Sequence, residues 1–264
     1  MEKNKKIILI IAGSLIVLIG IVIGVLLIVN NKKLNEEQII AQEEQQLSEE
    51  ELENNFKKKF YNIEYTEDKN EIVSKGYFYE AEKENEYNIK LNIPQINKET
   101  EVTKQINKTI VNIYGNKLLD IINNKNEYTV YNADFITYNN DNIISIIIKT
   151  VLKEGSQAQR TTVETYNYDI ENDKLITLNE VLKEKNIDKS KAQTKIINTI
   201  REKNTNTKIL AEQGYNIYVR DIRSEEYLLE NIQTFFIDEN GYLYILFPYG
   251  NKNYTETMDV IILK

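Results

Sequence analysis

The feature that most constrains this chain is a run of 23 residues without a charge, from Ile7 to Val29. At about 1.5 Å per residue, a helix of this length spans a hydrocarbon core of about 30 Å. The run is longer than the roughly 7–15 apolar residues of a secretory signal peptide, and no small-x-small cleavage site follows it. We therefore expect residues 7–29 to form an uncleaved transmembrane helix that contacts membrane lipid.

Positive charges on the two sides of this run indicate its orientation. Three lysines and the α-amine precede it, whereas Lys32 and Lys33 follow it. The excess on the first side favours a cytoplasmic N-terminus. We expect a single-pass protein of the cell membrane, with residues 1–6 as a cytoplasmic tail and residues 30–264 outside the cell.

Gly20 and Gly24 lie about one helical turn apart within the predicted span. Such a pair lets two membrane helices approach closely and dimerise. Glycine is also frequent in membrane helices that make no such contact, so both interpretations stay open.

Residues 30–59 are strongly acidic. Between Leu34 and Phe56 there are eight Glu and no Lys or Arg. Apolar residues recur there at roughly helical spacing, and Ser48 with Glu51 has the pattern of a capping box. The pattern predicts a solvated helical stalk that holds a domain away from the membrane, and a loose coiled coil is the alternative.

The composition excludes several classes of chemistry. The 264 residues include no His, no Cys and no Trp, which excludes Ser-His-Asp and Cys-His catalysis, disulfides, and zinc sites built from His or Cys. No glycine-rich run precedes a helix, so no phosphate loop is predicted, and the net charge of −8 disfavours a nucleic-acid partner. A pair of carboxylates is the catalytic device that remains, but 41 Asp and Glu make chance pairs common. We expect a protein that is not an enzyme and has no cofactor and no metal site.

Beyond residue 60, β-rich segments alternate with a few helices. Strands are expected at residues 61–66, 76–81, 87–93, 128–138, 143–152, 161–169, 232–237, 242–247 and 258–263. Pro94 is expected to close the third of them, and Thr100 and Thr177 to cap helices. Because most of these strands are joined by hairpin turns, we expect an α+β fold with an antiparallel sheet and packed helices. We divide this part into two regions, 60–160 and 161–264.

Two polar loops between strands are the candidate ligand-binding regions. The first contains Gly155 and Ser156, and the second contains Pro248, Tyr249 and Tyr254. Tyrosine offers a large apolar area and a hydroxyl with few rotatable bonds, which suits a binding surface. The same tyrosines are equally suited to packing a long loop onto the sheet, and both interpretations stay open.

Two stretches of this sequence resemble the family of RsiV-like extracellular domains, which occurs in an anti-sigma factor and beside deacetylase modules in PdaC-type proteins. The first runs from Gly155 through the TYNYD run at residues 165–169 to Leu182. The second runs from Phe235 through Phe247-Pro-Tyr to Tyr254. Residues 89–97 resemble a companion region that precedes this domain in the family. Together, these resemblances cover about residues 60–264.

The resemblance implies an α+β domain that binds a ligand and does not catalyse. In the anti-sigma factor this domain is a receptor for lysozyme, and the five residues of the two loops are the implied binding residues. No sigma factor is expected, because residues 1–6 are too few to hold one. We expect a sensor or wall-binding protein of a Gram-positive cell envelope that binds a lysozyme-like protein or peptidoglycan glycan. The alternatives are a membrane-tethered glycan-acting enzyme that uses a carboxylate pair, and a structural envelope component.

Overall fold

The computed structural model describes most of the chain beyond residue 46. The described residues are 47–63, 72–124, 127–251, 253 and 258–264. The chain divides into two compact units, Met1–Leu52 and Glu53–Lys264. The fold described below belongs to the second unit.

The predicted membrane helix at residues 7–29, with Gly20 and Gly24, lies outside the described residues. The predicted cytoplasmic tail and most of the predicted stalk also lie outside them. Within the part of the chain that the structure describes, no helix combines the length and the apolar character needed to span a membrane.

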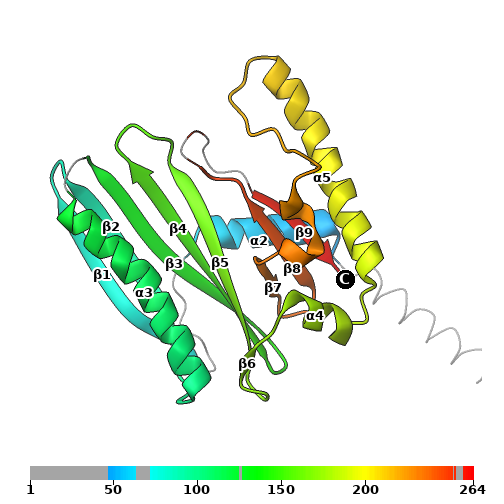
Figure 1. Cartoon of the computed structure of the whole chain (residues 1–264), viewed down its shortest axis with the longest axis horizontal. Helices are drawn as coiled ribbons and strands as arrows, with labels where there is room; N and C mark the ends of the chain where they lie inside the picture. Colours follow the sequence, from blue (N-terminus) through cyan, green and yellow to red (C-terminus); the bar gives the residue numbers. More distant parts are fainter. Residues whose placement is uncertain (1–46, 64–71, 125–126, 252, 254–257) are drawn as a thin grey trace, which may run out of the picture. The chain divides into compact units, whose positions relative to one another are not determined.

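The described part confirms an α+β fold, and Figure 1 shows its four α-helices and two β-sheets. The helices are α2 (Glu49–Tyr61), α3 (Glu101–Asn123), α4 (Leu178–Glu184) and α5 (Lys189–Glu212), with two 3₁₀ turns, η1 (Glu225–Tyr227) and η2 (Leu229–Asn231). The large sheet contains β1 (Val73–Lys83), β2 (Tyr87–Ile96), β3 (Thr129–Asn140), β4 (Ile143–Glu154), β5 (Arg160–Asp169) and β6 (Lys174–Leu175). The small sheet contains β7 (Phe235–Ile237), β8 (Leu243–Pro248) and β9 (Met258–Leu263).

The large sheet is mixed, which corrects the prediction of an antiparallel sheet. Its strands follow the order of the chain, and all neighbours are antiparallel except β2 and β3, which are parallel. A parallel pair needs a long connection that carries the chain back to the end where the first strand began. Helix α3 is that connection, and it begins at a capping box formed by Thr100 and Thr103.

Strand β2 continues through Pro94 to Ile96, so the prediction that this proline closes the strand is wrong. The pairing of β2 with β3 ends at Leu91, and so the missing N–H of Pro94 breaks no hydrogen bond to β3. On the other side, the register of β1 shifts between Lys75 and Tyr77, opposite the proline. This bulge adapts the edge strand to the proline.

The start of the globular part also differs from the prediction. Tyr61, expected to begin a strand, is the last residue of α2, and residues 64–66 lie outside the described part. Phe56, assigned to the solvated stalk, is 3% exposed, with its ring 4.9 Å from that of Phe236. The ammonium of Lys203 on α5 lies 2.8 Å from the carboxylate of Glu53. From Glu53 onward, α2 therefore packs against the small sheet and α5.

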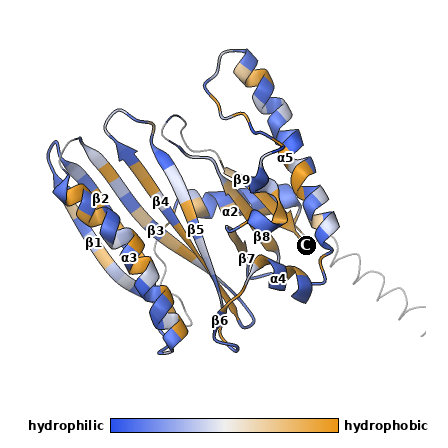
Figure 2. Cartoon of the chain, in the orientation of Figure 1, coloured by the Kyte–Doolittle hydropathy of each residue, from blue (hydrophilic) through white to orange (hydrophobic). Residues whose placement is uncertain are grey.

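Side chains alternate between the two faces of the large sheet. Ile89, Leu91 and Tyr131 belong to a core that includes the buried face of α3. Because neighbouring residues in a strand point to opposite faces, Lys90 and Asn132 lie on the face away from α3. Figure 2 shows hydrophobic residues concentrated along β4, β8 and β9, the strands that run through the two cores.

The two sheets are joined by side chains of the large sheet that bind the backbone of β7. The hydroxyl of Ser145 accepts a hydrogen bond of 3.0 Å from the N–H of Ile237. The amide of Asn167 donates one of 2.8 Å to the carbonyl of Phe235. The predicted boundary between residues 160 and 161 falls at the start of β5, which pairs with β4, so described residues on both sides of it share one sheet.

Candidate functional site

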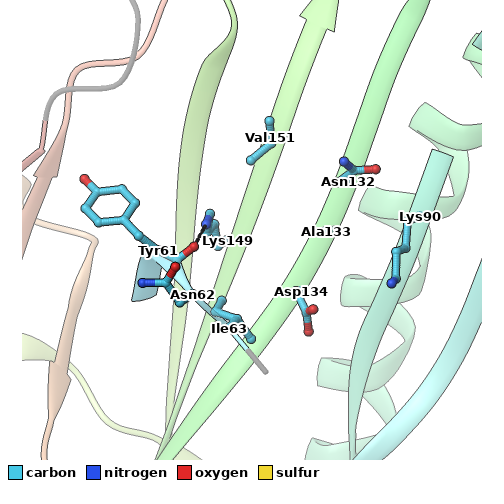
Figure 3. Close-up of a pocket in the computed structure, with 9 residues that line it drawn as sticks. All are labelled: Tyr61, Asn62, Ile63, Lys90, Asn132, Ala133, Asp134, Lys149 and Val151. Carbon is cyan, nitrogen blue, oxygen red and sulfur yellow. Dashed lines mark hydrogen bonds between the residues drawn. The ribbon is translucent and has the colours of Figure 1, made fainter. Parts of the chain in front are cut away.

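A pocket of about 270 Å³ opens on the face of the large sheet away from α3, and Figure 3 shows the residues that line it. Strands β2, β3 and β4 form its floor, and the end of α2 forms a wall. The lining residues are Tyr61, Asn62, Ile63, Lys90, Asn132, Ala133, Asp134, Lys149 and Val151.

Strand register brings the polar residues of the floor together. Lys90 on β2 lies directly opposite Asn132 on β3. Asp134, two residues further along β3, lies opposite Lys149 on β4. Since residues two apart in a strand share a face, these four side chains form one polar patch.

Lys149 holds the end of α2 against the sheet. Its ammonium donates hydrogen bonds of 3.1 Å to the carbonyl of Phe60 and 3.2 Å to that of Tyr61. It also lies 5.3 Å from the centre of the Phe60 ring. The last carbonyls of a helix lack partners within the helix and carry partial negative charge, so a lysine here satisfies them and fixes the wall of the pocket.

Asp134 is fixed in orientation. Its Oδ1 accepts a hydrogen bond of 2.8 Å from the amide of Asn92 and one of 2.9 Å from the N–H of Phe135. Asn92, two residues beyond Lys90 on the same face of β2, is only 3% exposed, so this donor is itself held in place by burial. Among the described residues no donor contacts the second oxygen, Oδ2, which therefore remains able to accept a hydrogen bond.

Asn132 and Lys90 have hydrogen-bonding capacity that the described residues do not use. The Oδ1 atom of Asn132 is buried and has no hydrogen-bond partner. The ammonium of Lys90, which is exposed, has no ion-pair or hydrogen-bond partner within the described part of the chain. Buried polar atoms in folded proteins nearly always have a partner, so an unpaired one at a pocket indicates a place for a ligand group or water.

The charge of the lining limits its chemistry. Of the described residues that line the pocket, Asp134 alone carries a carboxylate, beside the two lysines. Hydrolysis of glycosides needs two carboxylates about 5–10 Å apart, and the described residues of this lining do not supply such a pair. No group of three or more acidic residues with metal-binding geometry occurs in the described residues either. The arrangement is suited to binding a polar group.

A second pocket, of about 330 Å³, lies between β5 and the 3₁₀ turns. Its polar side chains on β5 already have partners. Asn167 binds Ser145 and the carbonyl of Phe235, and the hydroxyl of Thr165 accepts the N–H of Phe235. These groups join the two sheets, so this pocket offers less to a ligand than the first one.

Tyr249, a predicted binding residue, is 5% exposed and belongs to the core of the small sheet. Its hydroxyl donates to Asp259 at 2.9 Å and accepts from Tyr227 at 3.0 Å, and the ring of Tyr218 stacks on it at 4.7 Å. Burial, with the nearby charge of Asp259, raises the pKa of Tyr249 far above its ordinary value of 10.0. Its burial in this core favours the packing interpretation of Tyr249, and contact with a ligand stays a prediction.

The carboxylate of Asp259, buried beside Tyr249, also forms an ion pair. The guanidinium of Arg220 binds both oxygens of Asp259, with Nη2 and Oδ1 2.8 Å apart. A further nitrogen of Arg220 donates to the hydroxyl of Thr207 on α5. This network ties β9 to α5 and to the segment before η1.

The other predicted residues that the structure describes lie near the surface. Pro248 is the half-buried last residue of β8, opposite Met258, and Tyr254 lies outside the described residues. Ser156 is exposed at the turn between β4 and β5. Gly155 beside it has a φ of 51°, a conformation that favours glycine, and its N–H donates to the carbonyl of Tyr128 at 2.9 Å.

The structure brings the two predicted loops together next to the pocket. A β-carbon at Gly250 would lie 2.7 Å from the carbonyl oxygen of Thr161, so the backbone of the second loop touches the start of β5, just after the first loop. Thr161 lies opposite Val151, which lines the pocket and in turn lies opposite Asn132. The hydroxyl of Thr161 is buried and, like the amide oxygen of Asn132, has no hydrogen-bond partner in the described part of the chain.

The polar floor was not anticipated from the sequence. The run Tyr131-Asn-Ala-Asp-Phe135 alternates apolar and polar residues, which indicates a strand with one polar face. Most such faces are simply solvated, and which strands lie beside β3 depends on the parallel pairing with β2. The alternation therefore predicts that one face of this strand is polar, but it does not predict a pocket on that face.

Comparisons with known proteins do not assign this chain to a family. No model of a known protein family matches the chain, and no curated protein matches it. Among solved structures, a DUF3298 family protein from Pseudomonas aeruginosa PAO1 matches with a TM-score of 0.34 and 10% sequence identity. The match covers 41% of this chain and 56% of that one, so it spans little more than half of that protein.

Proposed function

We propose that residues 53–264 form a ligand-binding domain, which the predicted helix at residues 7–29 anchors outside the cell membrane. Its ligand is a polar component of the cell envelope, and peptidoglycan is the first candidate. The observation that carries the proposal is the pocket in which Asn132 Oδ1 and the ammonium of Lys90 have no partner among the described residues, beside a fixed Asp134.

The envelope location depends on the sequence. It follows from the predicted membrane span, the excess of lysines before it, and the resemblance to RsiV-like extracellular domains. A domain held close to the outer surface of a Gram-positive membrane lies beneath peptidoglycan, so wall fragments are the polar ligands that it meets most.

A cationic lysozyme-like protein is the second candidate, and the distribution of charge favours it. Residues 30–56 contain eight Glu and two Lys, a net charge of −6, whereas residues 57–264 contain 28 Lys and Arg and 32 Asp and Glu, a net charge of −4. Most of the field that would attract a cationic protein thus comes from the segment before the domain. Binding of such a protein would be sensitive to salt and would depend on residues 30–56.

Calorimetric titration of the full chain in lipid nanodiscs tests the proposal. The titrants are soluble peptidoglycan fragments and a lysozyme, each at low and high salt. We expect the fragments to bind, and Asn132→Ala to weaken the binding about tenfold or more. Lys108→Gln, a change on the exposed side of α3 at the opposite face of the sheet, is the matched control and leaves binding unchanged.

Three other results would count against the pocket. Salt-sensitive binding of lysozyme that is unaffected by Asn132→Ala supports the second candidate instead. Turnover of the fragments supports the carboxylate-pair enzyme. Failure of a folded protein to bind either titrant overturns the proposal.

A further inference from the structure

We infer that the pocket selects a ligand group that combines a carboxylate with amide N–H donors, the chemistry of a short peptide with a free carboxylate, over a neutral sugar. The inference rests on the proposed function and specifies which part of a wall ligand enters the pocket.

The floor offers two hydrogen-bond acceptors on one strand. They are the unpartnered Oδ1 of Asn132 and the free Oδ2 of Asp134, two residues apart on the same face of β3. Two residues along a strand span about 6–7 Å, which is also the repeat of N–H groups on one side of an extended peptide. An extended peptide lying along β3 therefore presents two donors at the spacing of these two acceptors.

The floor also offers a cation for an anionic group. Lys90 lies opposite Asn132, and its ammonium has no partner among the described residues. With Lys149 and Asp134, the described residues of the lining carry one net positive charge, which one ligand carboxylate would neutralise. The nearest register partner of Lys90 on the other side is Glu80, and no ion pair within 4.0 Å joins them in the described structure.

The described residues of the lining offer no aromatic platform beside Asn132 and Asp134 for a neutral sugar. Sugar rings commonly stack on the face of an aromatic side chain, and Tyr61 is the one aromatic residue among those described in the lining. Figure 3 shows the ring of Tyr61 pointing away from Asn132 and Asp134, toward the outside of the pocket. Its neighbour Phe60 lies against it edge-on at 5.3 Å, which holds the ring in that direction.

Binding of matched ligands by the full chain in nanodiscs tests the inference. The probes are N-acetylmuramoyl dipeptide, the same molecule with its carboxylates converted to carboxamides, and a neutral N-acetylglucosamine tetramer. We expect the acid to bind about tenfold or more tightly than the carboxamide form. Lys90→Gln should abolish this preference while leaving the affinity for the carboxamide form unchanged, and Lys108→Gln should preserve it.

The outcomes separate this inference from the proposed function. If the neutral tetramer binds as tightly as the acid and its binding requires Asn132, the proposed function holds and the inference is wrong. Equal affinity for acid and carboxamide also overturns the inference. If no probe binds a protein that still melts cooperatively, both fail. A muramoyl dipeptide with two L-residues identifies the source, because weaker binding of it indicates selection for wall stereochemistry.

Discussion

The buried hydroxyl of Tyr249 allows a quantitative test of its role. Tyr249→Phe keeps the ring in contact with Tyr218 and removes the hydrogen bonds to Tyr227 and Asp259. If this residue packs the core, the variant should lose stability and retain ligand binding. If it contacts the ligand, binding should fall while stability changes little.

The expected loss follows from the contacts. A hydrogen bond to a charged group, such as that from Tyr249 to Asp259, contributes about 1.5–3 kcal/mol. Removing the Tyr249 hydroxyl also leaves the buried hydroxyl of Tyr227 without its acceptor. Asp259 keeps Arg220 as a partner, so its charge stays compensated. We expect Tyr249→Phe to lower the free energy of unfolding by about 2–3 kcal/mol. Asp259→Ala leaves Arg220 buried and unpaired, and should cost about 3–5 kcal/mol.

Thermal and urea unfolding followed by circular dichroism measure these losses. For a domain of this size, about 1 kcal/mol corresponds to about 2–4 °C in the melting temperature, so Tyr249→Phe should melt about 4–12 °C lower. The double variant should lose less than the sum of the two single losses, because both remove the contact between Tyr249 and Asp259. An unchanged melting temperature together with lost ligand binding would refute the packing role.

Three further changes test other parts of the fold. Phe56→Ala should lower the free energy of unfolding by about 3–5 kcal/mol in urea, and an unchanged value would mean that α2 does not pack on the small sheet. Gly115→Ala, with open space around it, should stabilise by about 0.5–1 kcal/mol, whereas Gly250→Ala should destabilise by about 1–3 kcal/mol because its β-carbon meets Thr161. Burial raises the pKa of Glu164 above its ordinary value of 4.5, so the folded state keeps this proton longer than the unfolded chain, and stability is lost as pH rises from about 4.5 through the raised pKa. Glu164→Gln should therefore stabilise at pH 7 and have little effect at pH 3, and equal effects at both would contradict the burial argument.

Elements with local signals were predictable from the sequence. The capping box of Thr177 and Glu180 begins α4 as expected, and Asn240-Gly241 forms the turn between β7 and β8, with Gly241 at a φ of 80°. These signals act within a few residues, so no knowledge of the rest of the chain is needed.

Features that depend on distant residues were not predictable. The parallel pairing of β2 and β3 depends on where α3 returns the chain, and the burial of Phe56 depends on β7 and β8. Tyr249 lies in a polar loop sequence, yet Asp259 and Tyr227 give its hydroxyl two buried partners. The pocket on β2, β3 and β4 was not predictable from the sequence for the same reason, because its residues come from strands that meet only in the folded sheet.

The parallel pairing of β2 and β3 has a consequence for folding kinetics. Each antiparallel neighbour in the large sheet is joined by a short turn, whereas β2 and β3 pair only between Tyr87 and Leu91, across a connection that includes all of α3. Contacts between residues far apart in sequence form late, so the pairing of β2 with β3 is expected to form last in this sheet. Lys90 and Asn132 lie opposite each other in this pairing. A ligand that contacts both residues would therefore stabilise the pairing of β2 with β3, which links occupancy of the pocket to the step of folding that completes the large sheet.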